Sequence, residues 1–226
     1  MNLKDFNYDL PVELIAQSPA TNRDQSRLLI YNMHNKTILD SVFHNIYDHI
    51  RPNDCLILNN SKVIPARLYG IKEGGGAKVE VFLLNNKGDN VWEVMVRPGK
   101  RLKPGAVVNV ENGKMICEIL DVTDGGNRLA RFTYSGNFYE LLDEIGNMPL
   151  PPYITERLED NSRYQTVYAK TLGSAAAPTA GLHFTPELLE RIRAKGVDVV
   201  PVLLHVGLGT FRPVKEEDIE DHDMHS

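Results

Sequence analysis

The sequence predicts an α/β body with a mixed sheet and helices, interrupted by an inserted antiparallel six-stranded β-barrel. Between about residues 66 and 133 there are six short strand-like segments, each separated from the next by clusters of Gly, Asn, Asp or Pro. Regular spacing of this kind is typical of a small barrel or sandwich. On both sides of this stretch, helix signals accompany short apolar runs, which favours a body of mixed structure.

Four elements are predicted before the barrel. A short helix is expected around Val12 to Ala16, entered through Asp9-Leu10-Pro11, and a strand over Ser26 to Asn32. A second helix is predicted over Ser41 to His49, ended by Arg51-Pro52. The apolar run Asp54 to Leu58 is predicted to be a buried strand because turn residues bound it.

The barrel strands are expected at Arg67–Ile71, Lys78–Leu84, Val91–Val96, Ala106–Val110, Met115–Asp121 and Arg128–Thr133. Polar and apolar residues alternate from Lys78 to Phe82, as in a strand with one buried face. A helix at about Phe138 to Ile145 and the stretch Met148 to Pro152 are expected to close this unit. We therefore predict a barrel domain at residues 65–149 and a discontinuous body domain at residues 1–64 and 150–226.

Beyond the barrel, one helix has clear end signals. Thr185 is a good N-cap, Pro186 suits the first helical position, and Gly196 suits the C-terminal end. The run Val197 to Val206 that follows is predicted to be a buried strand.

Composition favours a globular protein of the cytoplasm. Of 226 residues, 42% are hydrophobic and 24% are charged, which is ordinary for that class. The apolar runs are too short to span a bilayer, and the first residues lack the core of a signal peptide. Cys55 and Cys117 suggest neither a disulfide framework nor a zinc site, so we expect no metal and no membrane association.

The net charge of −5 comes entirely from the C-terminal residues. Lys215 to Ser226 hold six acids and one base, whereas residues 1–214 balance at 24 bases and 24 acids. Within that neutral part, Lys62 to Lys103 carries nine bases against four acids. There is a basic region, but no overall charge that would by itself indicate nucleic-acid binding.

Three segments combine residues that could bind a ligand. Leu58 to Arg67 places two amides, a hydroxyl and two bases after a strand, where ligand contacts are common, although Asn59 and Asn60 equally suit a turn. Gly173 to Thr185 is rich in small residues and ends at a helix N-terminus, which favours anions. It lacks the Gly-Lys-Ser/Thr ending of a nucleotide P-loop, and it equally suits a tight connection with a partly buried His183.

The third segment, His205 to Arg212, follows the last predicted strand. Its Gly207-Leu208-Gly209 is weak evidence for a nucleotide site, because Arg212 stands where a third glycine would be required. Two weaker candidates are the basic hairpin tip Arg97 to Lys103 and the pair His222 and His225. That pair has metal-like spacing, but in an acidic terminal segment we interpret it as solvated.

These segments together resemble the S-adenosylmethionine:tRNA ribosyltransferase-isomerase family of queuosine biosynthesis. The resemblance is carried by the following blocks, in this order: Asn59 to Arg67, Met148 to Ile154, Tyr164 to Ala169, Gly173 to Thr185 and His205 to Val214, with Phe6 to Gln17 and Arg23 to Leu29. Each block is weak alone, but their order is specific and they cover essentially the whole chain.

The resemblance implies a reaction and a set of partners. S-adenosylmethionine donates its ribosyl moiety, which is transferred and isomerised onto 7-aminomethyl-7-deazaguanine at the tRNA wobble position. The products are epoxyqueuosine in tRNA, adenine and methionine. No metal or redox cofactor is implied. Members of the family continue beyond Ser226, so this chain is expected to be C-terminally truncated, with an incomplete body domain.

The reaction needs a base, and histidine is suited to the role near neutral pH. The two candidates are His205, which we prefer because it would end a buried strand, and His183. The residues expected to bind S-adenosylmethionine are Tyr168, Ser174, Thr179, Ala180, Gly181, Phe184, Gly207, Gly209, Thr210 and Phe211. The amides of Ala180 to Phe184 would bind its carboxylate, and Tyr168, Phe184 or Phe211 its adenine. The residues expected to contact RNA are Asn59, Ser61, Lys62, Arg67, Arg97, Lys100, Arg101 and Arg212.

Two alternatives remain open at this level. One is a non-catalytic RNA-binding fragment that uses the barrel as its reader, since barrels do bind nucleic acids. Against it, the predicted strands carry few exposed aromatic residues among basic ones. The other is a small-molecule transferase that uses a nucleoside cofactor without RNA, which the neutral body would suit. A monomer is the expected oligomeric state.

Overall fold

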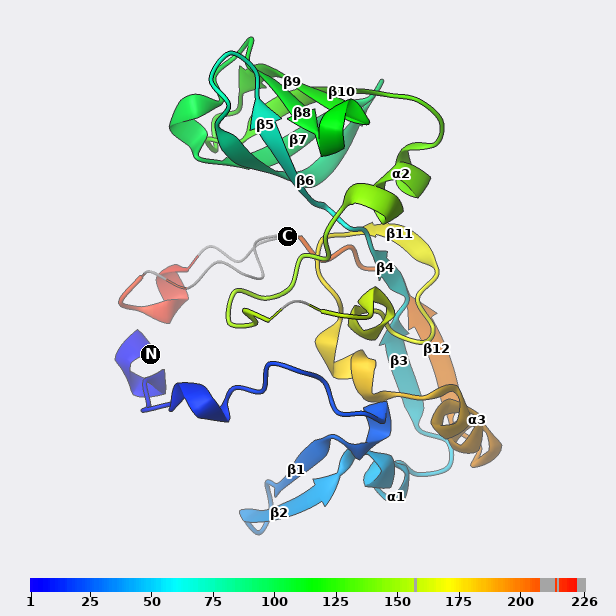
Figure 1. The fold of residues 1–226 in the computed structure, drawn as a ribbon. Coiled ribbons are helices and arrows are strands. Elements are labelled where there is room, and N and C mark those ends of the chain that lie inside the picture. Colours follow the sequence, from blue (N-terminus) through cyan, green and yellow to red (C-terminus); the bar gives the residue numbers. More distant parts are fainter. Residues whose placement is uncertain (157, 208–213, 215, 223–226) are drawn as a thin grey trace. The chain divides into compact units, whose positions relative to one another are not determined.

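The computed structural model describes residues 1–156, 158–207, 214 and 216–222 and contains two compact units (Figure 1). The body consists of Met1–Lys62 and Leu150–Ser226, and the barrel unit consists of Val63–Pro149. Among the described residues, no helix is both long and apolar enough to cross a bilayer.

The barrel unit is a closed antiparallel barrel of six strands, as predicted. Around the barrel the order is β10-β7-β6-β5-β8-β9, and β10 pairs with β9 to close it. The strands are β5 (Arg67–Lys72), β6 (Lys78–Gly88), β7 (Val91–Arg97), β8 (Val107–Val110), β9 (Met115–Val122) and β10 (Arg128–Tyr134). Closure leaves no strand edge unpaired, which removes the usual risk of edge-to-edge association.

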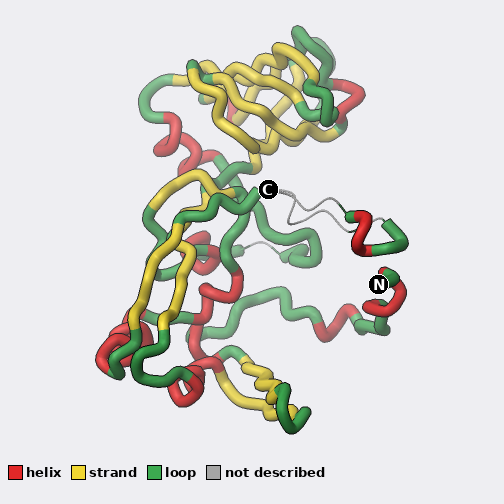
Figure 2. The backbone as a smooth tube through the Cα atoms, turned by 180° about the vertical axis from the view of Figure 1, so that it is seen from behind, coloured by secondary structure: helices red, strands yellow, loops and turns green. Residues whose placement is uncertain are grey.

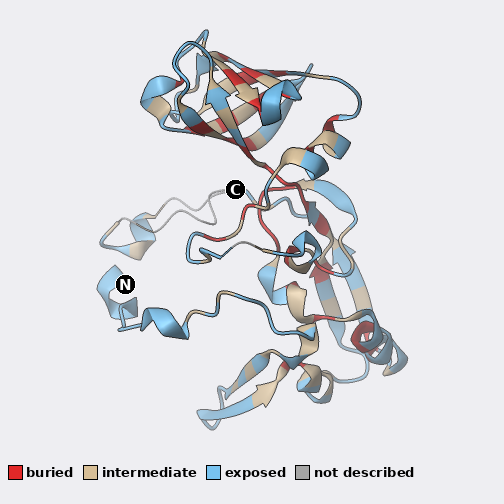
Figure 3. Ribbon diagram, in the orientation of Figure 1, coloured by how far each residue is buried: buried red, intermediate tan, exposed pale blue. Residues whose placement is uncertain are grey.

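Alternate residues of each strand fill the barrel interior. In β7 the side chains of Trp92, Val94 and Val96 are buried while those between them are only half-buried, and Figure 3 shows buried residues on several strands of the barrel. Helix α2 (Phe138–Ile145) begins at the predicted position and stacks Phe138 on Trp92 with 5.3 Å between ring centroids. Burial also raises the pKa of Cys117 to about 12, so this thiol is a packing residue.

The body is organised around a parallel strand pair and one helix. Strands β3 (Cys55–Asn59) and β12 (Asp198–Val202) lie side by side in Figures 1 and 2, in the register Cys55↔Asp198. Helix α3 (Pro186–Ala194) contributes three residues to a core cluster. The buried members of that cluster are Phe43, Leu58, Phe184, Leu188, Leu189, Ile192 and Val197.

The ends of α3 follow the sequence signals. The Thr185 hydroxyl accepts a hydrogen bond from the Leu188 amide at 3.1 Å, and Pro186 occupies the first turn. After the helix, Gly196 has a φ of +87°, a left-handed conformation that glycine adopts without strain. Local capping therefore sets both ends of this helix.

The other body elements are short. Strands β1 (Arg27–Asn32) and β2 (Thr37–Val42) form an antiparallel hairpin, and β4 (Ser61–Val63) pairs with β11 (Thr171–Ser174). Helix α1 spans Ile46–His49. Among the described residues, the remaining helical elements are 3₁₀ turns at Leu3–Phe6, Val12–Leu14, Arg23–Gln25, Phe43–Asn45, Asn161–Tyr164, Thr179–His183 and Ile219–Asp221 in the body, and Gly99–Arg101 and Glu111–Gly113 in the barrel unit.

The prediction of a helix over residues 41–49 was wrong. Ser41 and Val42 pair with Leu28 and Arg27 in the β1–β2 ladder, so only a 3₁₀ turn and the single-turn α1 remain. The helix expected around Val12 is likewise a single 3₁₀ turn. In both places, pairing or chain geometry overrides a weak local preference.

The prediction that the body strands are buried was also wrong. Ile57 of β3 is 63% exposed, and β12 ends at Val202, leaving Leu204 beyond it 63% exposed. Within the described ranges β12 pairs with β3 alone, and a sheet of two strands covers little of its own apolar surface. An apolar run in sequence therefore does not guarantee a buried strand.

Candidate functional site

The body contains a largely apolar cavity of about 320 Å³. Binding cavities for small ligands are typically about 300 to 1,000 Å³, mostly apolar, with a few polar groups that orient the ligand. The residues that line it are Ala16, Gln17, Ser18, Pro19, Ala20, Ser26, Leu150, Pro151, Tyr153, Ile154, Glu156, Leu158, Arg163, Tyr164, Thr179, Leu182 and His183. Its size and lining make it the candidate site for a nucleoside-sized molecule.

Three polar groups of this cavity come from two segments. His183 ends the 3₁₀ turn Thr179–His183 and is half-buried, with its ring 5.1 Å from that of Phe43. Thr179 begins the same turn and is exposed, as is Glu156. A titratable imidazole, a hydroxyl and a carboxylate therefore line one mainly apolar space.

Two further lining residues hold buried polar atoms. Arg163 Nε and the Tyr164 hydroxyl are both buried, and neither donates a hydrogen bond of standard geometry to a described residue, although the Ala177 backbone amide lies beside the Tyr164 oxygen. Burial raises the pKa of Tyr164, so its hydroxyl stays protonated at neutral pH and remains a potential donor. Unpaired buried donors are rare in folded proteins. Both atoms have almost no accessible surface, so they lie behind the cavity wall and not at its surface.

Two arginines hold the walls of the cavity together. Arg23 Nη2 donates to the Ser162 carbonyl at 2.7 Å and Nη1 to the Leu182 carbonyl at 3.1 Å. Arg163 donates in the opposite direction, from Nη1 to the Thr21 carbonyl at 3.0 Å and from Nη2 to that of Ala20. We call this reciprocal arrangement the arginine clasp.

The clasp places two like charges close together. Burial, and after it the charge of Arg163, lowers the pKa of Arg23, although a guanidinium stays protonated at neutral pH. Neither guanidinium forms an ion pair with a carboxylate in the part of the chain that the structure describes. Hydrogen bonds from Ser162 and, after them, the charges of Arg163 and Arg23 lower the pKa of the nearby Asp160 carboxyl. Two cations therefore lie near one carboxylate, and the wall at Arg163 keeps a positive charge that suits an anionic ligand group.

A glutamine joins a third segment to the same wall. Gln17 Nε2 donates to the Tyr153 carbonyl at 3.0 Å, and its Oε1 accepts from the Thr155 amide at 2.8 Å. Residues 15–17 are thereby fixed to residues 153–155. This amide is used in holding the chain, so we do not assign it to ligand binding.

A second cavity of about 490 Å³ lies on the other side of the clasp, lined by residues that include Arg23, Arg163 and Arg191. At its edge His44 joins two groups: Nδ1 lies 2.7 Å from Asp24 Oδ2, and Nε2 lies 2.7 Å from Arg191 Nη1. Because both ring nitrogens are occupied, we interpret His44 as a connector between α3 and the segment before β1.

The glycine-rich segment 173–185 has a more structural role than predicted. Ser174 is fully buried, donates to the Ala176 carbonyl at 2.7 Å and accepts from the Val206 amide at 3.0 Å. Phe184 lies in the core cluster, with its ring edge-on to Phe43. Neither side chain is available to S-adenosylmethionine, so the structure does not support Ser174 and Phe184 as residues that bind it.

The proposed carboxylate-binding amides need a similar correction. The Gly181 amide donates to the Pro178 carbonyl and the Phe184 amide to the Gly181 carbonyl, both within the 3₁₀ turn. Ala180 is exposed, and it does not line the cavity. Of this segment, Thr179 and His183 alone among the predicted residues reach the cavity.

Gly181 instead makes room for Tyr168. A Cβ atom at position 181 would lie 2.0 Å from the Tyr168 hydroxyl and 3.1 Å from Thr166 Cγ2. Tyr168 is itself half-buried against the core cluster, and burial raises its pKa. Its ring is thus a packing element that requires a glycine opposite.

We expect Gly181→Ala to destabilise the body by about 1 to 3 kcal/mol, the usual cost of overpacking. Adding Tyr168→Phe should restore part of the loss, because it removes the nearest atom while Cζ, at 3.2 Å, stays close. Urea unfolding followed by circular dichroism measures both. If the losses of unfolding free energy from the two substitutions simply added in the double variant, the contact between residues 181 and 168 would not be the cause of the destabilisation.

His205 does not lie where the sequence placed it. It follows the end of β12 by three residues, is exposed, and does not line the cavity. Its ring packs instead against Gly173, whose Cβ position would be 2.9 Å from His205 Cε1. The sequence favoured His205 over His183 because His205 was expected to end a buried strand. The structure does not place it there.

The residues predicted to contact RNA fall in both units. In the body, the Asn59 side chain bonds both backbone groups of Leu204, at 2.9 and 3.2 Å, and Ser61 is buried, while Lys62 is exposed. In the barrel unit, Arg67 lies 3.9 Å from Glu80 Oε1 and over the Phe82 ring. Arg97, Lys100 and Arg101 are exposed. Asn59 and Ser61 are thus structural residues.

Some predicted residues lie outside the described part of the chain: Gly209, Thr210, Phe211 and Arg212, together with His225. Gly207 is described and exposed, with open space around it. In the other direction, sequence reasoning missed Arg163 and Tyr164 as lining residues. The one available signal was for Tyr164, which begins the block Tyr164 to Ala169. Nothing local marks Arg163, because the partners of its guanidinium are distant carbonyls.

Comparison with known proteins gives consistent matches. Residues 3–226 match the model of a family described as queuosine biosynthesis protein. The chain is 56% identical over 226 residues to the S-adenosylmethionine:tRNA ribosyltransferase-isomerase of Desulfitobacterium hafniense, and 55% identical to that of Clostridioides difficile. Each match covers 100% of this chain and 66% of the relative, so the chain spans slightly less than two thirds of their length.

A solved structure is also similar in sequence. The crystal structure of S-adenosylmethionine tRNA ribosyltransferase from Thermotoga maritima is 33% identical, and the match covers 89% of this chain and 58% of that one, with a TM-score of 0.37.

Proposed function

The chain belongs to the queuosine biosynthesis protein family, and from this premise we propose that it acts as a transferase and isomerase on tRNA. It moves the ribosyl moiety of S-adenosylmethionine onto 7-aminomethyl-7-deazaguanine at the wobble position, and it isomerises that moiety to epoxyqueuosine. Adenine and methionine are released. The names of the relatives support the donor and the RNA, and the cavity of the body supports a nucleoside-sized donor.

We assign the donor to this cavity and the role of base to His183. The sulfonium acidifies the hydrogens on C5′ of the ribose, so a base must remove one before adenine leaves and the amine of the acceptor adds. Ring closure then expels methionine. His183 is the one histidine among the described lining residues, and an imidazole is suited to proton transfer near neutral pH.

The other polar lining residues can hold the ends of the donor. Arg163 is half-buried in the cavity wall, and its guanidinium suits the carboxylate of the methionine moiety, because guanidinium–carboxylate bonds are strong. Glu156 is the carboxylate at the rim and suits the positive sulfonium. Thr179 suits a ribose hydroxyl. The apolar residues Tyr153 and Ile154 offer a face to adenine.

The RNA partner requires contacts on other surfaces. We propose Lys62, Arg97, Lys100 and Arg101, all exposed, as groups that contact RNA phosphates. In this proposal residues 65–149 form the domain that supplies most of the RNA contacts, and residues 1–64 with 150–226 form the domain that binds the donor and supplies Lys62. The protein is proposed to act as a monomer in the cytoplasm, and the reaction invokes no metal.

The test is adenine release from S-adenosylmethionine, measured with and without tRNA that carries the modified base. Release that requires the modified tRNA is the expected result. Release without RNA would favour a small-molecule transferase. RNA binding without release, if it persists in a chain extended to the length of the relatives, would favour a non-catalytic RNA-binding protein.

A further inference from the structure

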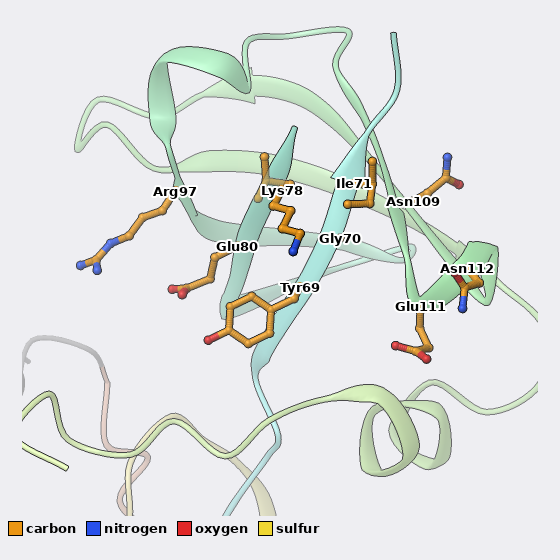
Figure 4. Close-up of a pocket in the computed structure, with 10 residues that line it drawn as sticks. Tyr69, Gly70, Ile71, Lys78, Glu80, Arg97, Asn109, Glu111 and Asn112 are labelled. Carbon is orange, nitrogen blue, oxygen red and sulfur yellow. The ribbon is translucent and has the colours of Figure 1, made fainter. Parts of the chain in front are cut away.

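The outer face of the barrel carries two rows of side chains fixed by strand register. Tyr69 of β5 pairs with Glu80 of β6, which pairs with Arg97 of β7. In the next row, Asn109 of β8 pairs with Ile71 of β5, which pairs with Lys78 of β6. These residues alternate with the buried ones, so their side chains project outward, as Figure 4 shows.

The two rows form an open groove of about 620 Å³. Its centre is apolar, because Tyr69 and Ile71 lie there. Tyr69 is 52% exposed and Ile71 is 43% exposed, at outer positions where polar residues are common. Asn109, Glu111 and Asn112 line one end, and Arg97 and Glu80 the other (Figure 4). An exposed aromatic ring beside a second apolar side chain offers a flat surface for a planar ligand.

Two cations, Lys78 and Arg97, and two carboxylates, Glu80 and Glu111, line the groove. Lys78 and Arg97 form no ion pair or side-chain hydrogen bond within the described ranges, but Glu80 Oε1 lies 3.9 Å from Arg67 Nε. The chain continues from Arg97 into Lys100, Arg101 and Lys103, which are also exposed and likewise lack ion pairs there. β7 and β8 are not neighbours in the barrel, so Arg97 to Lys103 is a connection with a 3₁₀ turn and not the hairpin tip that the sequence predicted. One end of the groove is therefore continuous with a positively charged connection.

We propose that this groove binds unpaired nucleotides of the RNA substrate. Tyr69 stacks on a base, Ile71 supports that base, and Lys78 and Arg97 contact the flanking phosphates. The combination of an aromatic platform with exposed cations on a barrel is what single-stranded nucleic acids require. The positive charge comes from Lys100, Arg101 and Lys103 beside the groove, because Glu80 and Glu111 balance Lys78 and Arg97 within it. The proposal rests on the proposed function for the identity of the partner as tRNA.

The groove favours unpaired RNA over a duplex or a protein. In duplex RNA the base faces are stacked on one another, so Tyr69 could contact none of them, whereas loop bases can be splayed onto an aromatic ring. An acidic protein segment would satisfy Lys78 and Arg97, but it would leave the tyrosine without a specific role. Dependence on the Tyr69 ring is therefore the distinguishing property.

The experiment measures binding of a fluorescent synthetic RNA hairpin with an unpaired loop to the full chain, alongside a fully paired duplex RNA. We expect Tyr69→Ala to weaken hairpin binding roughly tenfold, the size expected for one stacked base, and Tyr69→Phe to bind like the wild type. Tyr31→Ala is the matched control, because Tyr31 is also 52% exposed but lies on β1 in the body. It should leave binding unchanged.

A salt titration tests the two cations separately. Affinity decreases as salt concentration rises. For Lys78→Ala and for Arg97→Ala, the slope of log affinity against log salt concentration should become less negative by about 0.7 each, the value for one phosphate contact with a single strand. Photocrosslinking of the loop, mapped by mass spectrometry, should identify Tyr69 or its strand neighbours. This measurement needs no substitution and does not depend on how well a variant folds.

Equal hairpin binding by the wild type and Tyr69→Ala, or an equal loss for the duplex, would overturn the proposal. The adenine-release assay distinguishes a failure of the groove proposal from a failure of the proposed function. If the wild-type chain releases adenine and Tyr69→Ala leaves the KM for tRNA unchanged, the groove is wrong and the function stands. If hairpin binding depends on Tyr69 but an extended chain releases no adenine, the function is wrong and the groove stands.

Discussion

Replacing His183 by glutamine is expected to slow ribosyl transfer roughly 100- to 10,000-fold, the usual contribution of general acid–base catalysis. Glutamine keeps a polar side chain of similar length against Phe43 but cannot accept the proton from C5′. The direct readout is exchange of the C5′ hydrogens of S-adenosylmethionine in deuterated water. We expect that exchange to fall together with adenine release, while the KM for tRNA stays the same.

Two other histidines make this result decisive. His34→Gln, in the exposed turn between β1 and β2, controls for a general effect of losing an imidazole and should be neutral. His205→Gln tests the alternative that the sequence favoured. If C5′ exchange disappears in His205→Gln and persists in His183→Gln, the base is His205, and the donor is bound near Gly173 instead of in the cavity.

Replacing Arg163 by alanine is expected to destabilise the body by the order of 3 kcal/mol. The substitution removes two hydrogen bonds from a charged donor to the Thr21 and Ala20 carbonyls, each worth about 1.5 to 3 kcal/mol. Relief of the repulsion between Arg163 and Arg23 offsets part of this loss. Binding of S-adenosylmethionine should weaken as well, because the clasp holds the cavity wall.

The two units can be followed separately in this experiment. Trp92, the only tryptophan in the sequence, lies in the barrel unit, so its fluorescence reports on the barrel. Amide hydrogen exchange of residues 20–23 and 162–164 reports on the clasp. We expect faster exchange there and an unchanged Trp92 transition.

Arg193→Ala is the matched control for the clasp. Arg193 is exposed and pairs with Glu190 one turn earlier in α3, and such surface pairs contribute about 0 to 1 kcal/mol. If Arg163→Ala cost no more than Arg193→Ala, the clasp would be no more than a surface contact. The double variant Arg23→Ala/Arg163→Ala should lose less than the sum of the single variants, because both arginines serve one arrangement.

The barrel was predictable because its strands are marked locally. Each strand alternates or is bounded by turn residues, and antiparallel neighbours in sequence are joined by short connections, so pattern and pairing agree. Helix α3 was predictable for the same reason, since Thr185, Pro186 and Gly196 act within one turn of its ends. Closure and register, which bring Tyr69, Glu80 and Arg97 into one row, appear only in the folded barrel.

The candidate site was less predictable because its parts are far apart in the chain. The sequence alone determined the family, the inserted barrel and the interest of segment 173–185, because these depend on local patterns and on the order of blocks. Tertiary structure alone decided that His183 lines a cavity and His205 does not, that Ser174 and Phe184 are buried, and that Arg23 and Arg163 clasp each other's backbone. The arginine clasp, for example, depends on contacts between residues about 140 positions apart, and no local pattern encodes such contacts.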